Sequence, residues 1–102
     1  MEDKTVLSEE EIKEIVSEYT GWTIEGKCFV KRFYFERWND ITEFMKHLAN
    51  CIEKTNHHPD VNLHTGSRSI TIYTTTHAVG GLSKADRQLI DMLEQFKVDS
   101  SI

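Results

Sequence analysis

Histidine is unevenly distributed along this chain of 102 residues. Four of the five histidines, His57, His58, His64 and His77, fall within 21 positions, and two of them stand directly before Pro59, the only proline. Proline stiffens the peptide, so His57 and His58 should project in different directions from a fixed junction. Imidazole titrates near neutral pH, with an ordinary pKa of about 6.5. A cluster of imidazoles is therefore suited to proton transfer.

Three alternatives to acid–base chemistry by these histidines are a surface loop, a zinc site and a cysteine nucleophile. The histidines could simply lie at the surface of a loop. A zinc site is disfavoured because adjacent histidines rarely bind one ion and no H-x-H, H-x-x-x-H or paired cysteine accompanies them. Nucleophilic catalysis is weaker still, since Cys28 falls in a predicted strand and Cys51 in a predicted helix, where a lone cysteine is usually a buried apolar residue. The pattern favours acid–base chemistry, with no metal.

Hydrophobic periodicity predicts three helices that must position this cluster. They cover residues 8–19, residues 41–54 and a last segment that begins after Ser83. Each predicted helix follows a residue that can cap it: Ser8, Asn39 or Asp40, and Ser83. In the first and last helices an acidic residue three positions after the cap, Glu11 or Asp86, completes a capping box.

Segments rich in β-branched and aromatic residues predict two hairpins. The first lies within residues 22–36 and turns near Gly26. The second pairs residues 60–64 with residues 70–77 through a turn at Thr65–Ser67. Antiparallel pairing brings the end of the second strand beside the start of the first, so we expect His77 to lie near His58.

The element order is thus α-β-β-α-β-β-α, which is incompatible with a run of βαβ units. We expect an α+β fold with a four-stranded antiparallel sheet covered on one face by helices. The whole chain, residues 1–102, forms one domain with an ordered core of about residues 6–97, and a frayed tail from Val98. Apolar residues occupy both faces of the strand from Cys28 to Phe35. One face should meet the helices and the other a second copy of the chain.

Composition excludes several classes of function. Lys and Arg number 12 against 17 Asp and Glu, giving a net charge of −5, and the basic residues are dispersed. Direct binding to nucleic acid is therefore not expected. No apolar run approaches the roughly 20 residues needed to span a membrane, and the residues after Met1 do not resemble a signal peptide. Two isolated cysteines suit a reducing compartment, so we expect a cytoplasmic protein, with the nucleus as the alternative.

Two motifs around the histidines resemble those of the pterin-4a-carbinolamine dehydratase family, also known as the dimerisation cofactor of a homeodomain transcription factor. The motifs are Glu53-x-x-x-His57-His58-Pro59-Asp60 and Thr76-His77-Ala78-Val79-Gly80-Gly81-Leu82, followed by Asp86 and preceded by Gly21-Trp22. The resemblance extends over nearly the whole chain. It implies the same fold that the periodicity predicts.

The resemblance also implies an activity: a lyase that dehydrates 4a-hydroxytetrahydrobiopterin to quinonoid dihydropterin in tetrahydrobiopterin recycling, without metal or cofactor. It implies catalytic roles for His57, His58 and His77. It implies substrate-binding roles for Glu53, Pro59, Asp60, Thr76 and Asp86. A homotetramer built as a dimer of dimers would follow. The alternative is a non-catalytic protein-binding module that acts on a transcription-factor partner.

More specific roles can be expected for the three histidines and the two acidic residues near them. The resemblance makes His57 and His77 the acid–base pair and leaves His58 to bind and orient the pterin. Glu53 precedes His57 by one helical turn, where it either orients an imidazole or is solvated. Asp86 is expected to act as a helix N-terminal charge rather than as a catalytic group.

His64 and Trp22 could each either contact the substrate or have only a structural role. The family usually carries an aromatic residue about six positions after the proline, and here that stretch is Leu63 to Ser67. His64 either substitutes for the aromatic ring or is a solvent-facing turn residue. Trp22 is expected in the core rather than as a platform for substrate.

Overall fold

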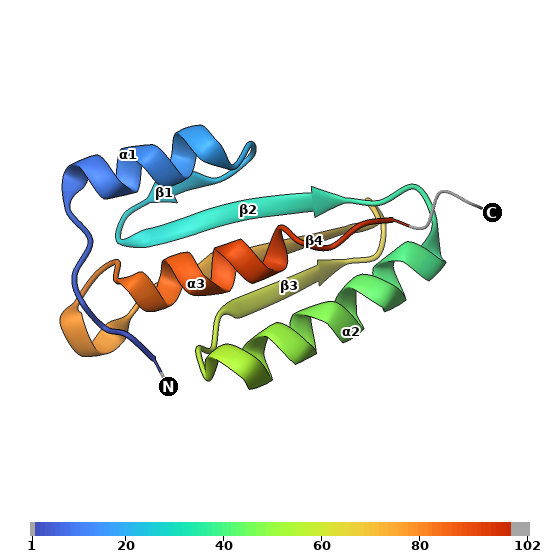
Figure 1. Ribbon diagram of the computed structural model, residues 1–102. Helices are drawn as coiled ribbons and strands as arrows, with labels where there is room; N and C mark the ends of the chain where they lie inside the picture. Colours follow the sequence, from blue (N-terminus) through green and yellow to red (C-terminus); the bar gives the residue numbers. More distant parts are fainter. Residues whose placement is uncertain (1, 99–102) are drawn as a thin grey trace.

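The computed structural model describes residues 2–98 (Figure 1). Its elements, in chain order, are α1 (Glu9–Glu18), β1 (Thr23–Glu25), β2 (Cys28–Tyr34), α2 (Trp38–Thr55), β3 (Asp60–His64), β4 (Ser69–Thr74), the short 3₁₀ helix η1 (His77–Val79) and α3 (Lys84–Leu93). The predicted α+β class and the order α-β-β-α-β-β-α are confirmed. The predicted fraying after Val98 lies outside the described residues.

The four strands form one antiparallel sheet with the order β1-β2-β4-β3. β2 and β4 are the central pair, in a register that sets Phe33 opposite Ile70. β3 joins the far side of β4, with Asp60 opposite Tyr73. Gly26 turns the first hairpin at a φ of +59°, a backbone conformation that glycine adopts at little cost.

All three helices cover the same face of the sheet, and α3 lies between α1 and α2 (Figure 1). Polar contacts support this placement. The hydroxyl of Tyr19, the C-cap residue of α1, donates to Asp91 of α3 at 2.6 Å, and His47 Nε2 of α2 donates to the Met92 carbonyl at 2.8 Å. The core between the helices and the sheet includes fully buried residues from every layer: Ile15, Trp22, Phe29, Phe44, Ile70, Ile72 and Ile90. Trp22 is therefore a core residue, as predicted.

The opposite face of the sheet is mainly polar. On β2 only Val30 is an apolar residue buried on this face, while Arg32 donates to the hydroxyls of Ser69 and Ser67, each at 2.9 Å. Tyr34 is 68% exposed. The strand alternation predicted from the sequence is correct, but the polar contacts of Arg32 interrupt the apolar residues on the outward face of β2.

Two predicted boundaries are wrong. α2 begins at Trp38, and its N-cap is Arg37, which makes no side-chain capping bond, rather than Asn39 or Asp40. Asp40 instead lies within the first turn, and its carboxylate accepts from the Arg37 guanidinium at 3.1 and 3.2 Å. This ion pair uses the acid that would otherwise cap the helix.

The strand predicted over residues 70–77 is also shorter than expected. β4 covers only Ser69–Thr74, because Thr76 does not pair with β3 and bridges to Gly81 instead. The Thr76 N–H donates to the Gly81 carbonyl at 2.8 Å, and the Gly81 N–H donates back at 3.3 Å. Gly80 closes this loop at a φ of +66°. His77 therefore begins η1 and is not the last residue of a strand.

Candidate active site

The C-terminal end of α2 positions His57 and His58. The Thr55 hydroxyl donates to the Cys51 carbonyl at 2.8 Å and accepts from the His57 N–H at 3.2 Å. Asn56 adopts a left-handed conformation, with a φ of 55°, that ends the helix and redirects the chain. As a result His57 is only 4% exposed, whereas His58 is an exposed residue. The prediction that the two side chains diverge is confirmed.

The loop between β4 and α3 brings His77 to the same place. The Thr75 hydroxyl donates to the Lys27 carbonyl at 2.6 Å and fixes the start of this loop against the first hairpin. His57, His58 and His77 line one cleft of about 200 Å³. Its other lining residues are Glu2, Lys4, Thr75, Thr76 and Ala78. The predicted return of His77 toward His58 is confirmed.

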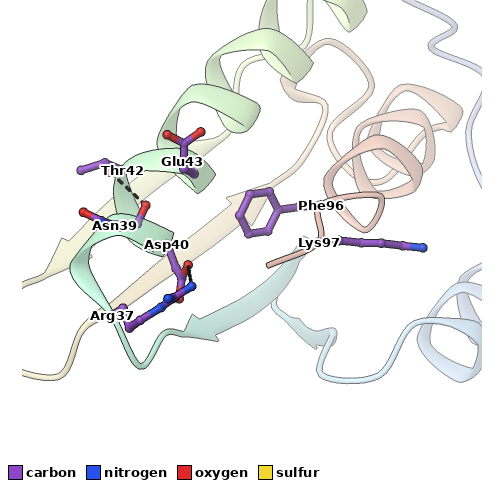
Figure 2. Close-up of a pocket in the computed structure, with 7 residues that line it drawn as sticks. All are labelled: Arg37, Asn39, Asp40, Thr42, Glu43, Phe96 and Lys97. Carbon is purple, nitrogen blue, oxygen red and sulfur yellow. Dashed lines mark hydrogen bonds and ion pairs between the residues drawn. The ribbon is translucent and has the colours of Figure 1, made fainter. Parts of the chain in front are cut away.

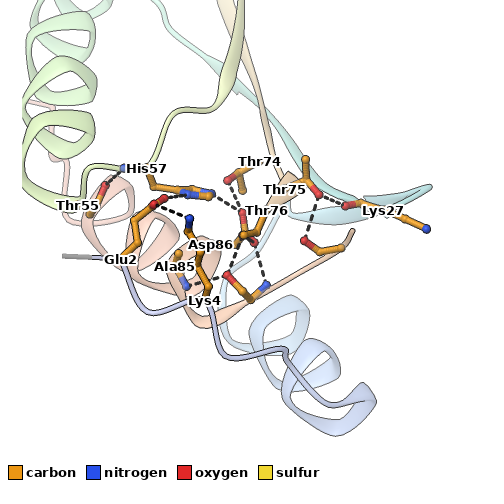
Figure 3. Close-up of polar contacts among 12 residues, drawn as sticks. Glu2, Lys4, Lys27, Thr55, His57, Thr74, Thr75, Thr76, Ala85 and Asp86 are labelled. Atoms are coloured by element: carbon orange, nitrogen blue, oxygen red, sulfur yellow. Dashed lines mark hydrogen bonds and ion pairs between the residues drawn. The ribbon is translucent and has the colours of Figure 1, made fainter. Parts of the chain in front are cut away.

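Asp86 is the polar centre beneath this cleft (Figure 3). It is fully buried, and its Oδ1 accepts from the Thr74 hydroxyl at 2.6 Å and lies 2.7 Å from His57 Nε2. Its Oδ2 accepts from the Thr76 hydroxyl at 2.7 Å and from the Ser83 N–H at 2.9 Å. Asp86 thus completes the predicted capping box of α3 and also contacts an active-site imidazole, a role that its sequence position did not indicate.

Glu2 is the second carboxylate in contact with His57, and no local sequence pattern predicts this contact. Its Oε1 lies 2.6 Å from His57 Nδ1, across 55 positions of the chain. The strand-like segment that carries Glu2 is attached to the start of α3 through backbone bonds from Leu7 N–H to Leu82 and from Lys84 N–H to Thr5. Only the tertiary structure brings this segment to the cleft.

The contacts of His57 with Asp86 and Glu2 shift the pKa values of all three side chains. The hydrogen bond with Asp86 raises the pKa of His57 against the opposing effect of burial, and the Glu2 contact raises it further. Burial favours a higher pKa for Asp86, but the bonds from His57, Thr74, Thr76 and Ser83 outweigh it and lower the pKa. The bond with His57 likewise lowers the pKa of Glu2. The charged forms of all three groups are favoured together.

Several residues predicted for the site lie elsewhere. Glu53 is exposed and is not among the residues that line the cleft, and both His57 ring nitrogens are already bonded to Glu2 and Asp86. The alternative of a solvated Glu53 therefore describes its position. Asp60 is exposed at the start of β3, where Pro59 precedes it, and neither lines the cleft.

His64 is placed on a different surface. It is the last residue of β3, half-buried on the face of the sheet away from the helices, and its Nε2 lies 3.2 Å from the Thr71 hydroxyl. It is therefore neither a turn residue nor part of the cleft of His57. This contact joins the neighbouring antiparallel strands β3 and β4 and accounts for the partial burial of His64.

Neither cysteine joins the cleft. Cys51 is fully buried in α2, and burial raises the pKa of its thiol, which reduces the fraction of reactive thiolate. Within residues 2–98, no cluster of three or more His, Cys, Asp or Glu side chains is arranged to hold a metal ion. The same range contains no helix with the length and hydropathy of a membrane span.

A second hollow, of about 530 Å³, lies at the N-terminal end of α2 (Figure 2). Its lining is Arg37, Asn39, Asp40, Thr42, Glu43, Phe96 and Lys97. It contains no histidine, and its best-defined contact is the ion pair between Arg37 and Asp40. The smaller histidine cleft is the candidate site because it combines converging titratable groups with shifted pKa values.

Comparison with known proteins identifies relatives of the chain. The family model for pterin 4 alpha carbinolamine dehydratase matches residues 5–96. A protein of Roseiflexus sp. (strain RS-1), which carries the provisional name pterin-4-alpha-carbinolamine dehydratase, is 33% identical over 91 residues, covering 89% of this chain and 96% of the relative.

Two solved structures share the fold. A structure described as a transcriptional coactivator/pterin dehydratase from Brucella melitensis superposes with a TM-score of 0.74 at 24% identity, covering 86% of this chain and 95% of the other. A pterin dehydratase-like protein described as a RuBisCO assembly factor in the alpha-carboxysome has a TM-score of 0.57 at 22% identity, covering 72% and 82%. At these identities the likeness concerns the fold alone.

The buried His57–Asp86 pair should give stability a defined pH dependence. We expect Asp86→Asn to lower the free energy of unfolding by about 2–4 kcal/mol where the pair is fully charged. The raised pKa of His57 makes its contribution complete below 6.5 and lost as the pH rises through the raised value. The lowered pKa of Asp86 makes its contribution complete above 3.8 and lost as the pH falls through the lowered value.

Urea unfolding of wild type and Asp86→Asn should therefore differ most between about pH 4 and pH 6.5 and less near pH 8. Asp91→Asn, which removes the partner of the Tyr19 hydroxyl instead, is the matched control. Its effect should not follow the His57 titration. A difference for Asp86→Asn that stays constant across this range would contradict the assigned pair.

Proposed function

Because the chain belongs to the pterin-4a-carbinolamine dehydratase family, we propose that it catalyses the dehydration of a 4a-hydroxytetrahydropterin such as 4a-hydroxytetrahydrobiopterin. The products are quinonoid dihydropterin and water, as in tetrahydrobiopterin recycling. The observation that carries this proposal is the convergence of His57, His58 and His77 in one cleft. No metal or cofactor is required, and a cytoplasmic location remains a prediction.

The reaction needs two proton transfers. The C4a–O bond breaks as the hydroxyl takes a proton and departs as water, and N5 loses its proton as the C4a=N5 double bond forms. An acid must therefore reach the C4a hydroxyl and a base must reach the adjacent N5, and two imidazoles on opposite sides of the flat pterin could serve these roles. An imidazole can serve either role near neutral pH because its ordinary pKa is about 6.5.

We assign the acid to His57 and the base to His77. His57 is bonded on both ring nitrogens to carboxylates, which favours the imidazolium that can protonate a leaving hydroxyl. His77 is exposed at the start of η1, and within residues 2–98 its side chain makes no contact with a carboxylate, so it is available to accept the N5 proton. His58, exposed beside Pro59, binds and orients the pterin.

Of the five residues expected to bind substrate, we propose that three contribute to the site. Thr76 lines the cleft, and Asp86 acts through His57 from beneath it. Pro59 contributes by fixing the backbone that follows the two histidines. Glu53 and Asp60 lie outside the cleft lining of this chain.

A second candidate function is a non-catalytic protein-binding role, including one toward a transcription factor. It is favoured by the fold shared with a protein described as a RuBisCO assembly factor and with one described as a coactivator. Such a role needs neither the three histidines nor the buried carboxylate that supports one of them. The retained site therefore favours the enzyme.

The deciding experiment follows the ultraviolet absorbance of 4a-hydroxytetrahydropterin as it decays in the presence of purified protein and a chelator. The uncatalysed rate, itself dependent on acid and base, is subtracted at every pH. Acceleration that survives the chelator supports the proposed dehydratase. Decay at the uncatalysed rate would favour the binding role.

Variants of the proposed acid and base should each slow the reaction. General acid–base catalysis by one side chain contributes roughly 10²–10⁴-fold, so His57→Ala and His77→Ala should each lose rate on that scale, and the double variant should approach the uncatalysed rate. His64→Ala is the matched control, since His64 lies outside the cleft. A double variant as active as wild type would refute the assignment. If the His57→Ala variant unfolds, His57→Gln can replace it in this test, because glutamine keeps a hydrogen-bonding group between the two carboxylates.

Replacement of His58 should have a different kinetic effect. An orienting contact made equally in the ground state and the transition state contributes uniform binding. His58→Ala is therefore expected to raise KM more than it lowers kcat. Steady-state kinetics over a range of substrate concentrations measures both. An unchanged KM with a large loss of kcat would instead give His58 a direct part in proton transfer.

Assembly as a homo-oligomer, a dimer of dimers by family resemblance, is also proposed. β3 is an edge strand of the described sheet, and it carries Val61 and Leu63 at 39% and 43% exposure, with Met45 of α2 at 38%. Exposed apolar residues at an open strand edge are typical of surfaces that pair with another chain. Light scattering should return a multiple of 11.9 kDa at micromolar concentration. A monomer would contradict this prediction.

A further inference from the structure

Glu2 reaches the active-site imidazole from a part of the chain that neither motif includes. Its Oε1 lies 2.6 Å from His57 Nδ1, and its side chain is 18% exposed (Figure 3). The segment after it is fixed by the bridge between Val6 and Ser83. Lys4 Nζ lies 3.6 Å from the other carboxylate oxygen. The contact is therefore held from both the backbone and a neighbouring cation.

The number of protons on His57 follows from these contacts. A neutral imidazole has one N–H and one lone pair, so it can donate to only one of two carboxylates. His57 faces a carboxylate oxygen on each nitrogen, at 2.6 Å toward Glu2 and 2.7 Å toward Asp86. A lone pair directed at an anionic oxygen would be repulsive. Two ionised carboxylates therefore require the imidazolium form, with a proton on Nδ1 and another on Nε2.

The two carboxylates differ in their access to the cleft. Asp86 is fully buried and does not line it, whereas Glu2 does. The Nε2 side of His57 is thus directed into the protein and the Nδ1 side toward the cleft. A ligand that takes a proton from His57 must approach the position that the Glu2 carboxylate occupies.

We propose that Glu2 is a positioning residue of this site: it holds the His57 ring with a proton on Nδ1 and yields that place to the leaving hydroxyl of the substrate. The proposal rests on the dehydratase function. In the reaction the Nδ1 proton passes to the hydroxyl oxygen, the C4a–O bond breaks and water departs. The proton removed from N5 must return to His57 or to solvent before the next turnover.

Other charged and titratable groups also surround His57. They come from the N-terminal segment, the junction before β3, η1 and α3: Lys4, His58, His77 and Asp86. Asp86 supports the imidazolium from the buried side, and Lys4 partly balances the charge of Glu2. Removal of Glu2 should therefore leave His57 charged over a narrower pH range rather than neutral throughout.

The first test needs no substrate. Glu2→Gln keeps the length of the side chain and a carbonyl acceptor for Nδ1–H but removes the charge. The matched control is Asp3→Asn, since the Asp3 carboxylate accepts hydrogen bonds from Thr5 and not from His57. The His57 imidazole is titrated by NMR in the ligand-free protein, with its signal assigned from His57→Gln. We expect its midpoint to move to lower pH in Glu2→Gln and to stay in place in Asp3→Asn. An unmoved midpoint in Glu2→Gln overturns the proposal.

The second test is kinetic. If His57 must carry a proton on Nδ1 to act as the acid, the limb of the kcat profile that falls at high pH should move to lower pH in Glu2→Gln. Each pH unit of displacement reduces the protonated fraction about tenfold above the midpoint, so a loss of up to about tenfold is expected near pH 8, with recovery near pH 6. Glu2→Asp, which keeps the charge, should retain more activity at high pH than Glu2→Gln. A role limited to anchoring the segment would lower activity equally at every pH, and that result overturns the proposal.

The two tests separate this proposal from the function on which it rests. Absence of turnover by the wild-type protein would overturn the dehydratase function, and the NMR titration would still decide whether Glu2 controls the protonation of His57. If the His57 midpoint moves in Glu2→Gln but the kcat profile of the active enzyme does not, the positioning role is overturned. A common displacement of midpoint and profile supports it.

Discussion

The hydrogen bonds to the Asp86 carboxylate connect the sheet, α3 and the junction that carries His57, and the site depends on all three. They come from the end of the central strand β4, from the loop after it, from the first turn of α3 and from the imidazole that follows α2. A fully buried carboxylate is costly unless its oxygens are paired. Four donors satisfy this one, so the same contacts that permit its burial also align three elements.

This arrangement couples the stability of the fold to the protonation of the site. Asp86 caps α3 and accepts from His57 with the same carboxylate, so neither role can change without the other. The Ser83 hydroxyl extends the network, because it donates to Thr76 Oγ1, whose own proton is directed to Asp86. The core helix and the cleft are therefore one cooperative unit. The exposed His58 and His77 lie at the rim of this unit, where side-chain motion is less restricted.

The comparisons illustrate why the site and the fold carry different information. Structures with TM-scores of 0.74 and 0.57 share this architecture, yet their descriptions range from a coactivator/pterin dehydratase to an assembly factor. A fold can host unrelated functions, so function must be argued from particular side chains. Here those side chains are an imidazole enclosed by two carboxylates and two exposed imidazoles beside it. The larger hollow near Arg37 has volume but no such chemistry.

The sequence by itself determined the element order, the helix caps at Ser8 and Ser83 and the convergence of His57, His58 and His77. These features follow from local periodicity, capping patterns and antiparallel pairing over short distances along the chain. It also identified the family, because the histidine motifs are contiguous in the sequence.

Only the tertiary structure decided which carboxylates serve the imidazole. Local spacing left open whether Glu53, one helical turn before His57, orients an imidazole or is solvated, but the actual partners Glu2 and Asp86 are 55 and 29 positions away. Likewise, Thr76 leaves the sheet to pair with Gly81, and His64 lies against Thr71. These partners are close along the chain, but the periodicity of the sequence does not specify either contact. Periodicity reports which face of an element is buried. It carries no information on which buried polar groups will meet, since that depends on how the completed layers pack together.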